Sequence, residues 1–220
     1  MRMCFTKMQG CGNDYIYFNC LEKEILYPND LSKKLSNRRF SIGGDGIILI
    51  CPSKIADAKM RIFNSDGSEA KMCGNGIRCV GKYLFDNKIV KSKYMKVETL
   101  SGVKCLEIKE NGNCTSVTVD MGIPSFKAKD IPLIVSKEET DNYPISFSGS
   151  TYKTVCLSMG NPHCVIFCEN PNKVDISNVS DTIEKMGIFP EGINTEFVRI
   201  IHEKKILMRV HERGSGETLA

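Results

Sequence analysis

Short apolar runs that alternate with polar residues dominate the first 120 positions and predict β-strands. Such runs cover residues 3–9, 14–20, 47–51, 59–63, 94–99, 103–109 and 115–121. Two segments, 30–39 and 77–87, have a helical pattern instead. The second segment has no strong polar face, so we expect a helix that is buried against the strands.

The chain also repeats itself with a long period, because motifs of its first half recur 148 residues later. The matched pairs are Met60–Asn64 with Met208–Glu212, Gly12–Asn13 with Gly160–Asn161, Glu69 with Glu217, and 42–50 with 190–198. Four matches at one ungapped offset indicate an internal duplication and two similar domains. The predicted layout is a first domain over 1–122, a connection over 123–148 and a second domain over 149–220. In the second domain we expect strands near 152–158, 163–168, 195–201 and 205–211, and a helix over 180–186.

Composition and charge narrow the range of functions. Hydrophobic residues make up 41% of the 220 positions, and the net charge of +4 is spread without a basic block. No run approaches the ~18 apolar residues of a membrane helix, and the N-terminus lacks the apolar run of a signal peptide. We therefore expect a cytoplasmic protein with no nucleic-acid partner and no membrane partner.

The eleven cysteines are too scattered for a disulfide scaffold, and no C-x-x-C pair indicates a metal site. We expect most of them to be small buried hydrophobic side chains. These are Cys4, Cys11, Cys20, Cys51, Cys79, Cys105, Cys114, Cys156, Cys164 and Cys168. Cys73 is treated separately because of its position.

Cys73 stands directly before a Gly-Asn-Gly turn that leads into the predicted helix 77–87. A thiolate is stabilised at a helix N-terminus, and the N–H groups of Gly74–Gly76 can bind a carboxylate. A duplicated turn of this kind would place two thiols on opposite faces of one carbon. That arrangement can invert a stereocentre without a cofactor, whereas a single copy alone favours a buried structural thiol.

The repeat places the counterpart of Cys73 at position 221, one residue past Ala220. By comparison with the first copy, roughly 50 further residues would complete the second. We therefore expect the second domain to be incomplete within these 220 residues, and the 220-residue chain by itself to be inactive.

Six motifs, in order along the chain, resemble the diaminopimelate epimerase family. They are Gly12–Asp14, Phe63–Ser68, Met72–Gly76, Gly160–Cys164, Gly192–Asn194 and Glu212–Thr218. The resemblance implies a mixed α/β (α+β) fold of two pseudo-symmetric domains, each a curved, mostly antiparallel sheet around a central helix, with the active site between them. It also implies a pyridoxal-independent epimerase that interconverts LL- and meso-diaminopimelate in lysine and cell-wall biosynthesis.

The same resemblance implies roles for individual residues. Cys73 matches one catalytic thiol, and the second belongs in a Cys-Gly-Thr-Gly turn at position 221. His163 and Glu212 match residues that assist the proton transfers. Substrate-binding positions are matched by Asn13, Asn64, Gly74, Asn75, Asn161, Asn194, Glu212 and Arg213. Gly46 supplies no side chain at a position where some family members carry Gln.

The polar candidates also have structural interpretations. Amide side chains can bind both carboxylates and ammonium groups, but Asn64, Asn161 and Asn194 also occur in turn-forming contexts. Arg213 can hold a distal carboxylate with two hydrogen bonds, or it can form a surface ion pair. A single histidine such as His163 is more often structural.

Two alternative functions stay open at this point: a racemase of another amino acid on the same fold, and an inactive fragment that binds substrate. In each case we expect a small-molecule amino-acid ligand, no cofactor and no metal. A homodimer is left open as the state of assembly.

Overall fold

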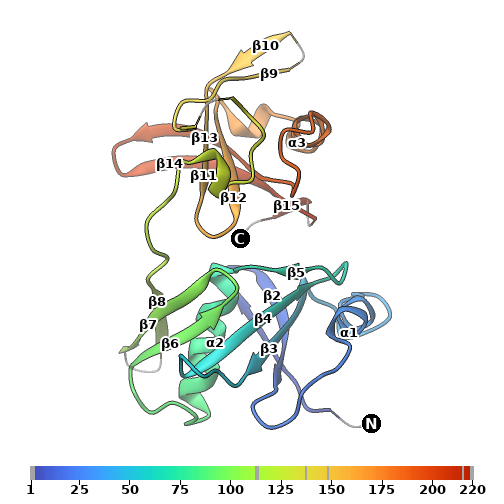
Figure 1. The fold of residues 1–220 in the computed structure, drawn as a ribbon, viewed down its shortest axis with the longest axis vertical. Helices are drawn as coiled ribbons and strands as arrows, with labels where there is room; N and C mark the ends of the chain where they lie inside the picture. Colours follow the sequence, from blue (N-terminus) through green and yellow to red (C-terminus); the bar gives the residue numbers. More distant parts are fainter. Residues whose placement is uncertain (1–2, 112–113, 137, 148, 215, 219–220) are drawn as a thin grey trace. The chain divides into compact units, whose positions relative to one another are not determined.

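The computed structural model describes residues 3–111, 114–136, 138–147, 149–214 and 216–218, which fold into two compact units that divide after Gly122 (Figure 1). None of the helices in this described part of the chain is long and apolar enough to cross a membrane.

The first unit is an eight-stranded sheet that curves around a helix (Figure 1). Its strands are β1 (Thr6–Gly10), β2 (Asn13–Asn19), β3 (Gly46–Cys51), β4 (Ala58–Asn64), β5 (Glu69–Ala70), β6 (Tyr94–Thr99), β7 (Gly102–Asn111) and β8 (Cys114–Val119), and its helices are α1 (Pro28–Leu35) and α2 (Gly74–Asp86). The strand order is β1-β2-β3-β4-β6-β7-β8, with β5 paired to β4. The β2–β3 and β4–β6 pairs are parallel and the other pairs are antiparallel, which confirms the predicted mostly antiparallel sheet.

Alternating side chains along the central strands form a core on both faces of this sheet. Tyr17 and Ile48 pack on the side of α2, and Leu84 of that helix is fully buried with them. Phe18 and Leu49 point to the opposite face, where α1 covers them. Helix α2 is therefore the buried central helix that the sequence predicted.

The second unit contains a smaller sheet with the strand order β11-β12-β13-β14-β15. Its elements are β11 (Thr154–Ser158), β12 (Pro162–Phe167), β13 (Asn194–His202), β14 (Lys205–Glu212), β15 (Gly216–Thr218), α3 (Ile176–Lys185), the hairpin β9 (Ile145–Phe147) and β10 (Ser150–Tyr152), and the short 3-10 helices η1 (Ala128–Asp130) and η2 (Pro171–Lys173).

The duplication predicted from the sequence is present in the fold. Strands β1 to β5 recur 148 residues later as β11 to β15, and α1 recurs as α3. Neighbouring strands pair in the same order of antiparallel, parallel, antiparallel and antiparallel. Even the ion pair Arg61–Glu69 recurs, as Arg209–Glu217, with 2.7 Å between Nε and Oε1 in both. The positions equivalent to α2 and to β6, β7 and β8 lie beyond residue 220.

Helices α2 and α3 begin three to four residues earlier than predicted, because a side chain caps each of them. The Sγ atom of Cys73 accepts the backbone N–H of Gly76 at 3.2 Å. In α3, Oδ1 of Asp175 accepts the backbone N–H of Asn178 at 3.2 Å. Helix α1 begins at Pro28, whose fixed φ suits the first turn.

Residues 123–148 are part of the second unit, so the predicted connection is wrong. Ile131, Leu133, Ile145 and Phe147 are buried in the core of that unit, together with Ile166 of β12. Ile131 and Leu133, and likewise Ile145 and Phe147, alternate over only three residues, which is too short a run for the sequence pattern to place them.

The cysteines divide more evenly between core and surface than predicted. Those that are buried are Cys20, Cys79, Cys156 and Cys164, whereas Cys4, Cys11 and Cys105 are exposed. Cys51, Cys73 and Cys168 are half-buried, and the side chain of Cys114 lies outside the described residues. The exposed thiols lie before β1, in the β1–β2 turn and on β7, where no second layer covers them.

Strands β3 and β4 approach each other very closely at Gly46. A Cβ atom added there would lie 2.1 Å from the carbonyl oxygen of Phe63, which is a backbone atom.

We expect Gly46→Ala to force the strands apart and to cost about 1–3 kcal/mol of local stability. Hydrogen exchange of the β3 and β4 amides measures that loss. Gly74→Ala is the control, since the added Cβ meets only Met121 at 3.7 Å; equal protection in the two variants would contradict the prediction.

Candidate functional site

Cys73 lies immediately before α2, in an extended backbone conformation with φ −144° and ψ 111°. Its half-buried Sγ atom accepts the N–H of Gly76 at 3.2 Å. Gly74 and Asn75 follow as the first two residues of the helix, where backbone N–H groups have no partner within the helix. These N–H groups and the positive end of the helix dipole stabilise a thiolate at this position.

Two glycines allow the chain to pack tightly around this thiol. A Cβ on Gly76 would lie 2.6 Å from Cδ1 of Ile48, and a Cβ on Gly10 would lie 3.1 Å from the carbonyl oxygen of Asn75. The tip of the β1–β2 hairpin therefore rests against the first turn of α2. The Asn75 side chain also accepts a hydrogen bond from Arg78, which orients its amide.

Asn13 and Asn64 lie at the same end of the first sheet, because β2 begins at Asn13 and β4 ends at Asn64. Strand β3 between them pairs Gly46 with Asn64. Asn64 donates from Nδ2 to Oγ of Ser68 at 3.1 Å. Asn13 is buried, and its Oδ1 has no hydrogen-bond partner among the described residues. A buried unpaired amide oxygen is costly, and it is typical of a position that binds a ligand.

A cluster of charged side chains fixes the start of β2 beside Asn13. Arg38 lies 2.5 Å from Asp14 and 2.8 Å from Asp45, and Nζ of Lys7 lies 2.6 Å from Asp14. Burial raises the pKa of the Asp14 carboxyl, but the hydrogen bonds from Arg38 and Lys7 outweigh it and lower the pKa to about 2. Asp14 is therefore ionised at neutral pH, and the cluster holds the backbone that carries Asn13.

In the second unit the structure brings two of the predicted residues into contact. Nε2 of His163, on β12, lies 3.0 Å from Oδ1 of Asn161. Nδ1 of the same ring lies 2.6 Å from Oε1 of Glu196, a buried residue of β13. Burial raises the pKa of the Glu196 carboxyl, and the hydrogen bond from His163 opposes that rise.

Asn194, Glu212 and Arg213 lie at the same end of the second sheet, at the start of β13 and the end of β14. Oδ1 of Asn194 accepts the backbone N–H of Arg213 at 2.9 Å. Oε1 of Glu212 accepts the hydroxyl of Thr218 at 2.9 Å. The Arg213 guanidinium donates to the carbonyl oxygen of Glu191 while staying partly exposed, so it can also reach a ligand.

The predicted residues therefore form one set in each unit, at equivalent ends of the two sheets. The first set is Asn13, Asn64, Cys73, Gly74 and Asn75, and the second set is Asn161, His163, Asn194, Glu212 and Arg213. The duplication relates Asn13 to Asn161 and Asn64 to Glu212. The first set contains a thiol and amides, and the second contains amides, an imidazole, a carboxylate and a guanidinium.

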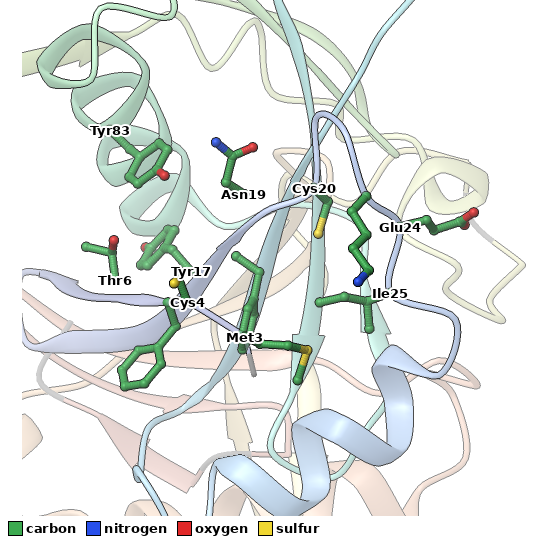
Figure 2. A pocket seen from close by; sticks show the side chains of 12 residues that line it. Met3, Cys4, Thr6, Tyr17, Asn19, Cys20, Glu24, Ile25 and Tyr83 are labelled. Carbon is green, nitrogen blue, oxygen red and sulfur yellow. The ribbon is translucent and has the colours of Figure 1, made fainter. Parts of the chain in front are cut away.

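The pocket in Figure 2 is a separate feature of the first unit. Met3 and Cys4 line it before β1, together with Asn19 and Cys20 at the end of β2 and Tyr83 of α2 (Figure 2). It therefore lies at the opposite end of the β1–β2 hairpin from Asn13. Within the described part of the chain, no cluster of three or more His, Cys, Asp or Glu side chains is arranged to hold a metal ion.

Sequence reasoning missed three residues that contact the two sets, namely Glu196, Arg78 and Thr218. Glu196 had a usable signal, because the duplication places it opposite the apolar Ile48. A charged residue at a position where the other copy has a core residue is expected to be buried, and buried charged residues are usually paired. Arg78 and Thr218 carried no comparable signal, since both residue types are common on surfaces.

Known proteins resemble this chain in sequence and in fold. The sequence model of the family described as diaminopimelate epimerase matches residues 5–127 and 155–220. A diaminopimelate epimerase from Acetivibrio thermocellus is 49% identical over 219 residues, which are 99% of this chain and 78% of that protein. One from Methanococcus maripaludis strain C5 is 48% identical over 99% of this chain and 79% of its own length. A solved hydroxyproline epimerase from Agrobacterium vitis shares the fold, with a TM-score of 0.68 at 13% identity over 98% of this chain and 72% of that one. The chain belongs to the diaminopimelate epimerase family.

Proposed function

We propose that this protein is a pyridoxal-independent epimerase that interconverts LL- and meso-diaminopimelate, acting in the cytoplasm in lysine and cell-wall biosynthesis. The observation that carries the proposal is the position of Cys73, whose Sγ atom caps α2 at 3.2 Å from the N–H of Gly76. Relatives that are 48–49% identical and bear the name diaminopimelate epimerase support the choice of substrate.

Epimerisation begins with removal of the proton on the α-carbon, which is a very weak acid. A thiolate at Cys73 is a suitable base, because the N–H groups and the positive dipole end at a helix N-terminus favour the thiolate form. The N–H groups of Gly74 and Asn75 can bind the α-carboxylate, onto which part of the negative charge of the carbanion spreads. Oriented N–H donors of this kind stabilise developing charge without having to reorganise.

Inversion requires that the proton returns from the opposite face of the carbon. The C–H bond breaks to protonate Cys73, and a second thiol then donates its proton to form the new C–H bond, which leaves that thiol as a thiolate. The two cysteines thus exchange protonation states, and the reaction needs neither an oxidant nor a reductant. The 148-residue offset assigns the second thiol to position 221.

The second unit supplies the groups that recognise the rest of the substrate. Diaminopimelate carries an ammonium and a carboxylate at each end, and the amides of Asn161 and Asn194 can bind either charge. We assign the distal carboxylate to Arg213, whose planar guanidinium suits a bidentate pair. His163 and Glu212 are assigned to moving protons to and from the thiols, as groups that titrate or accept hydrogen bonds.

Replacing Cys73 tests the assigned base directly. In the full-length protein, Cys73→Ala should lower the rate of meso-isomer formation from LL-diaminopimelate by at least about 10³-fold, within the range that general acid–base groups contribute. Chiral chromatography without added pyridoxal phosphate measures the product. Cys105→Ala, which removes an exposed thiol of β7, should leave the rate unchanged. Normal turnover in Cys73→Ala would refute the assignment.

Arg213 should determine the preference for a substrate with two carboxylates. The wild type should epimerise LL-diaminopimelate far better than lysine, which lacks the distal carboxylate. Loss of one partner of such a charge pair costs ~2–5 kcal/mol, so Arg213→Met should reduce kcat/KM for diaminopimelate by about 30-fold or more and leave lysine little affected. Arg199→Met, at an exposed position of β13, is the control. Equal kcat/KM for the two substrates in the wild type would exclude diaminopimelate as the preferred substrate.

A further inference from the structure

A glutamate and a histidine are paired inside the second unit. Glu196 is 8% exposed, and its Oε1 lies 2.6 Å from Nδ1 of His163 on the neighbouring parallel strand. Its second oxygen, Oε2, is buried and has no hydrogen-bond partner among the described residues. Burying a carboxylate with one oxygen unpaired costs free energy, so stability alone does not account for this pair.

The equivalent positions in the sheet of the first unit carry no histidine–glutamate pair. The residues 148 positions before His163 and Glu196 are Tyr15 and Ile48. Both are buried in the apolar core, at 5% and 0% exposure. The strands that carry them pair in the same register as their counterparts in the second unit. The sheet itself therefore does not require a charged pair at this position.

We infer that Glu196 is a positioning residue for His163: its carboxylate holds a proton on Nδ1 and leaves Nε2 as the nitrogen that exchanges protons. This inference rests on the proposed function, in which His163 assists proton transfer. Nε2 is also the ring nitrogen that lies 3.0 Å from Asn161, an assigned substrate-binding residue. The nitrogen assigned to proton exchange therefore contacts a residue of the second set, Asn161.

Both hydrogen-bonding arrangements of the ring lead to the same assignment. With two N–H groups, the ring donates to Glu196 and to Oδ1 of Asn161. If the Asn161 amide is turned over, a neutral ring accepts at Nε2 and still donates from Nδ1. With Glu196 ionised, its carboxylate can only accept a hydrogen bond, so the proton lies on Nδ1 in both arrangements. A carboxylate that orients an imidazole in this way is a general device for fixing its tautomer.

The first test reads the tautomer in the unmodified protein and needs no substrate. The chain has three histidines, His163, His202 and His211, so ¹⁵N-labelled imidazole signals can be assigned with one His163→Gln sample. At a pH where the ring is neutral, we expect the nitrogen shifts of His163 to show a single tautomer with the proton on Nδ1. A proton on Nε2 in the neutral ring would overturn the inference.

The second test removes the charge while keeping the shape. In Glu196→Gln the amide can either accept or donate, so we expect a mixture of His163 tautomers and a fall in kcat of at least about 10-fold, with KM little changed. Glu203→Gln, in the exposed β13–β14 turn, is the control and should change neither the His163 tautomer nor kcat. Unchanged tautomer and kcat in Glu196→Gln would overturn the inference. A wild type without epimerase activity would refute the proposed function alone, because the tautomer is measured separately.

Discussion

The hydrogen bond from the Gly76 N–H to Cys73 Sγ is the interaction on which the candidate residues of the first unit depend. It makes the thiol part of the helix N-terminus, so the position of α2 in the core also fixes the position of the sulfur. That position is determined tightly, because Gly76 passes so close to Ile48 that a methyl group would not fit without a shift. The contact between Gly10 and Asn75 then brings the β1–β2 hairpin, with Asn13 after its turn, to the same helix end.

The duplicated sheet supports two different chemical environments without changing its strand plan. In the first unit, Tyr15 and Ile48 complete an apolar core under α2. In the second unit, the equivalent positions carry His163 and Glu196, which form a buried hydrogen-bonded pair. The Arg–Glu ion pair that links β4 to β5 is instead kept in both units. Residues that stabilise the sheet therefore persist across the duplication, whereas the assigned proton-transfer residues differ.

Much of this architecture could be predicted from the sequence, because the 148-residue offset constrains many elements at once. The offset paired Asn161 with Asn13 and Glu212 with Asn64, the family resemblance implied their roles, and the alternation of apolar residues located the strands. Two kinds of feature escaped prediction. Residues 123–148 contribute to the core only through short apolar runs that give a weak sequence signal, and the start of α2 depends on a thiol cap, which is rare among helix caps. Glu196 had one signal in the duplication, its position opposite the apolar Ile48, but its burial and its distance to His163 are needed to reveal its role.

The central claim is that two different bases act on opposite faces of one carbon, with Cys73 as one of them. Its most direct test is the position of deuterium early in the reaction of LL-diaminopimelate in D₂O. A thiol carries one proton, so the base that removes a proton cannot deliver a solvent deuteron to the same face within one turnover. The account predicts one deuterium in each newly formed meso molecule and almost none in the recovered LL substrate. Deuterium that enters both isomers equally from the first turnovers would show a single exchanging base and would contradict the account.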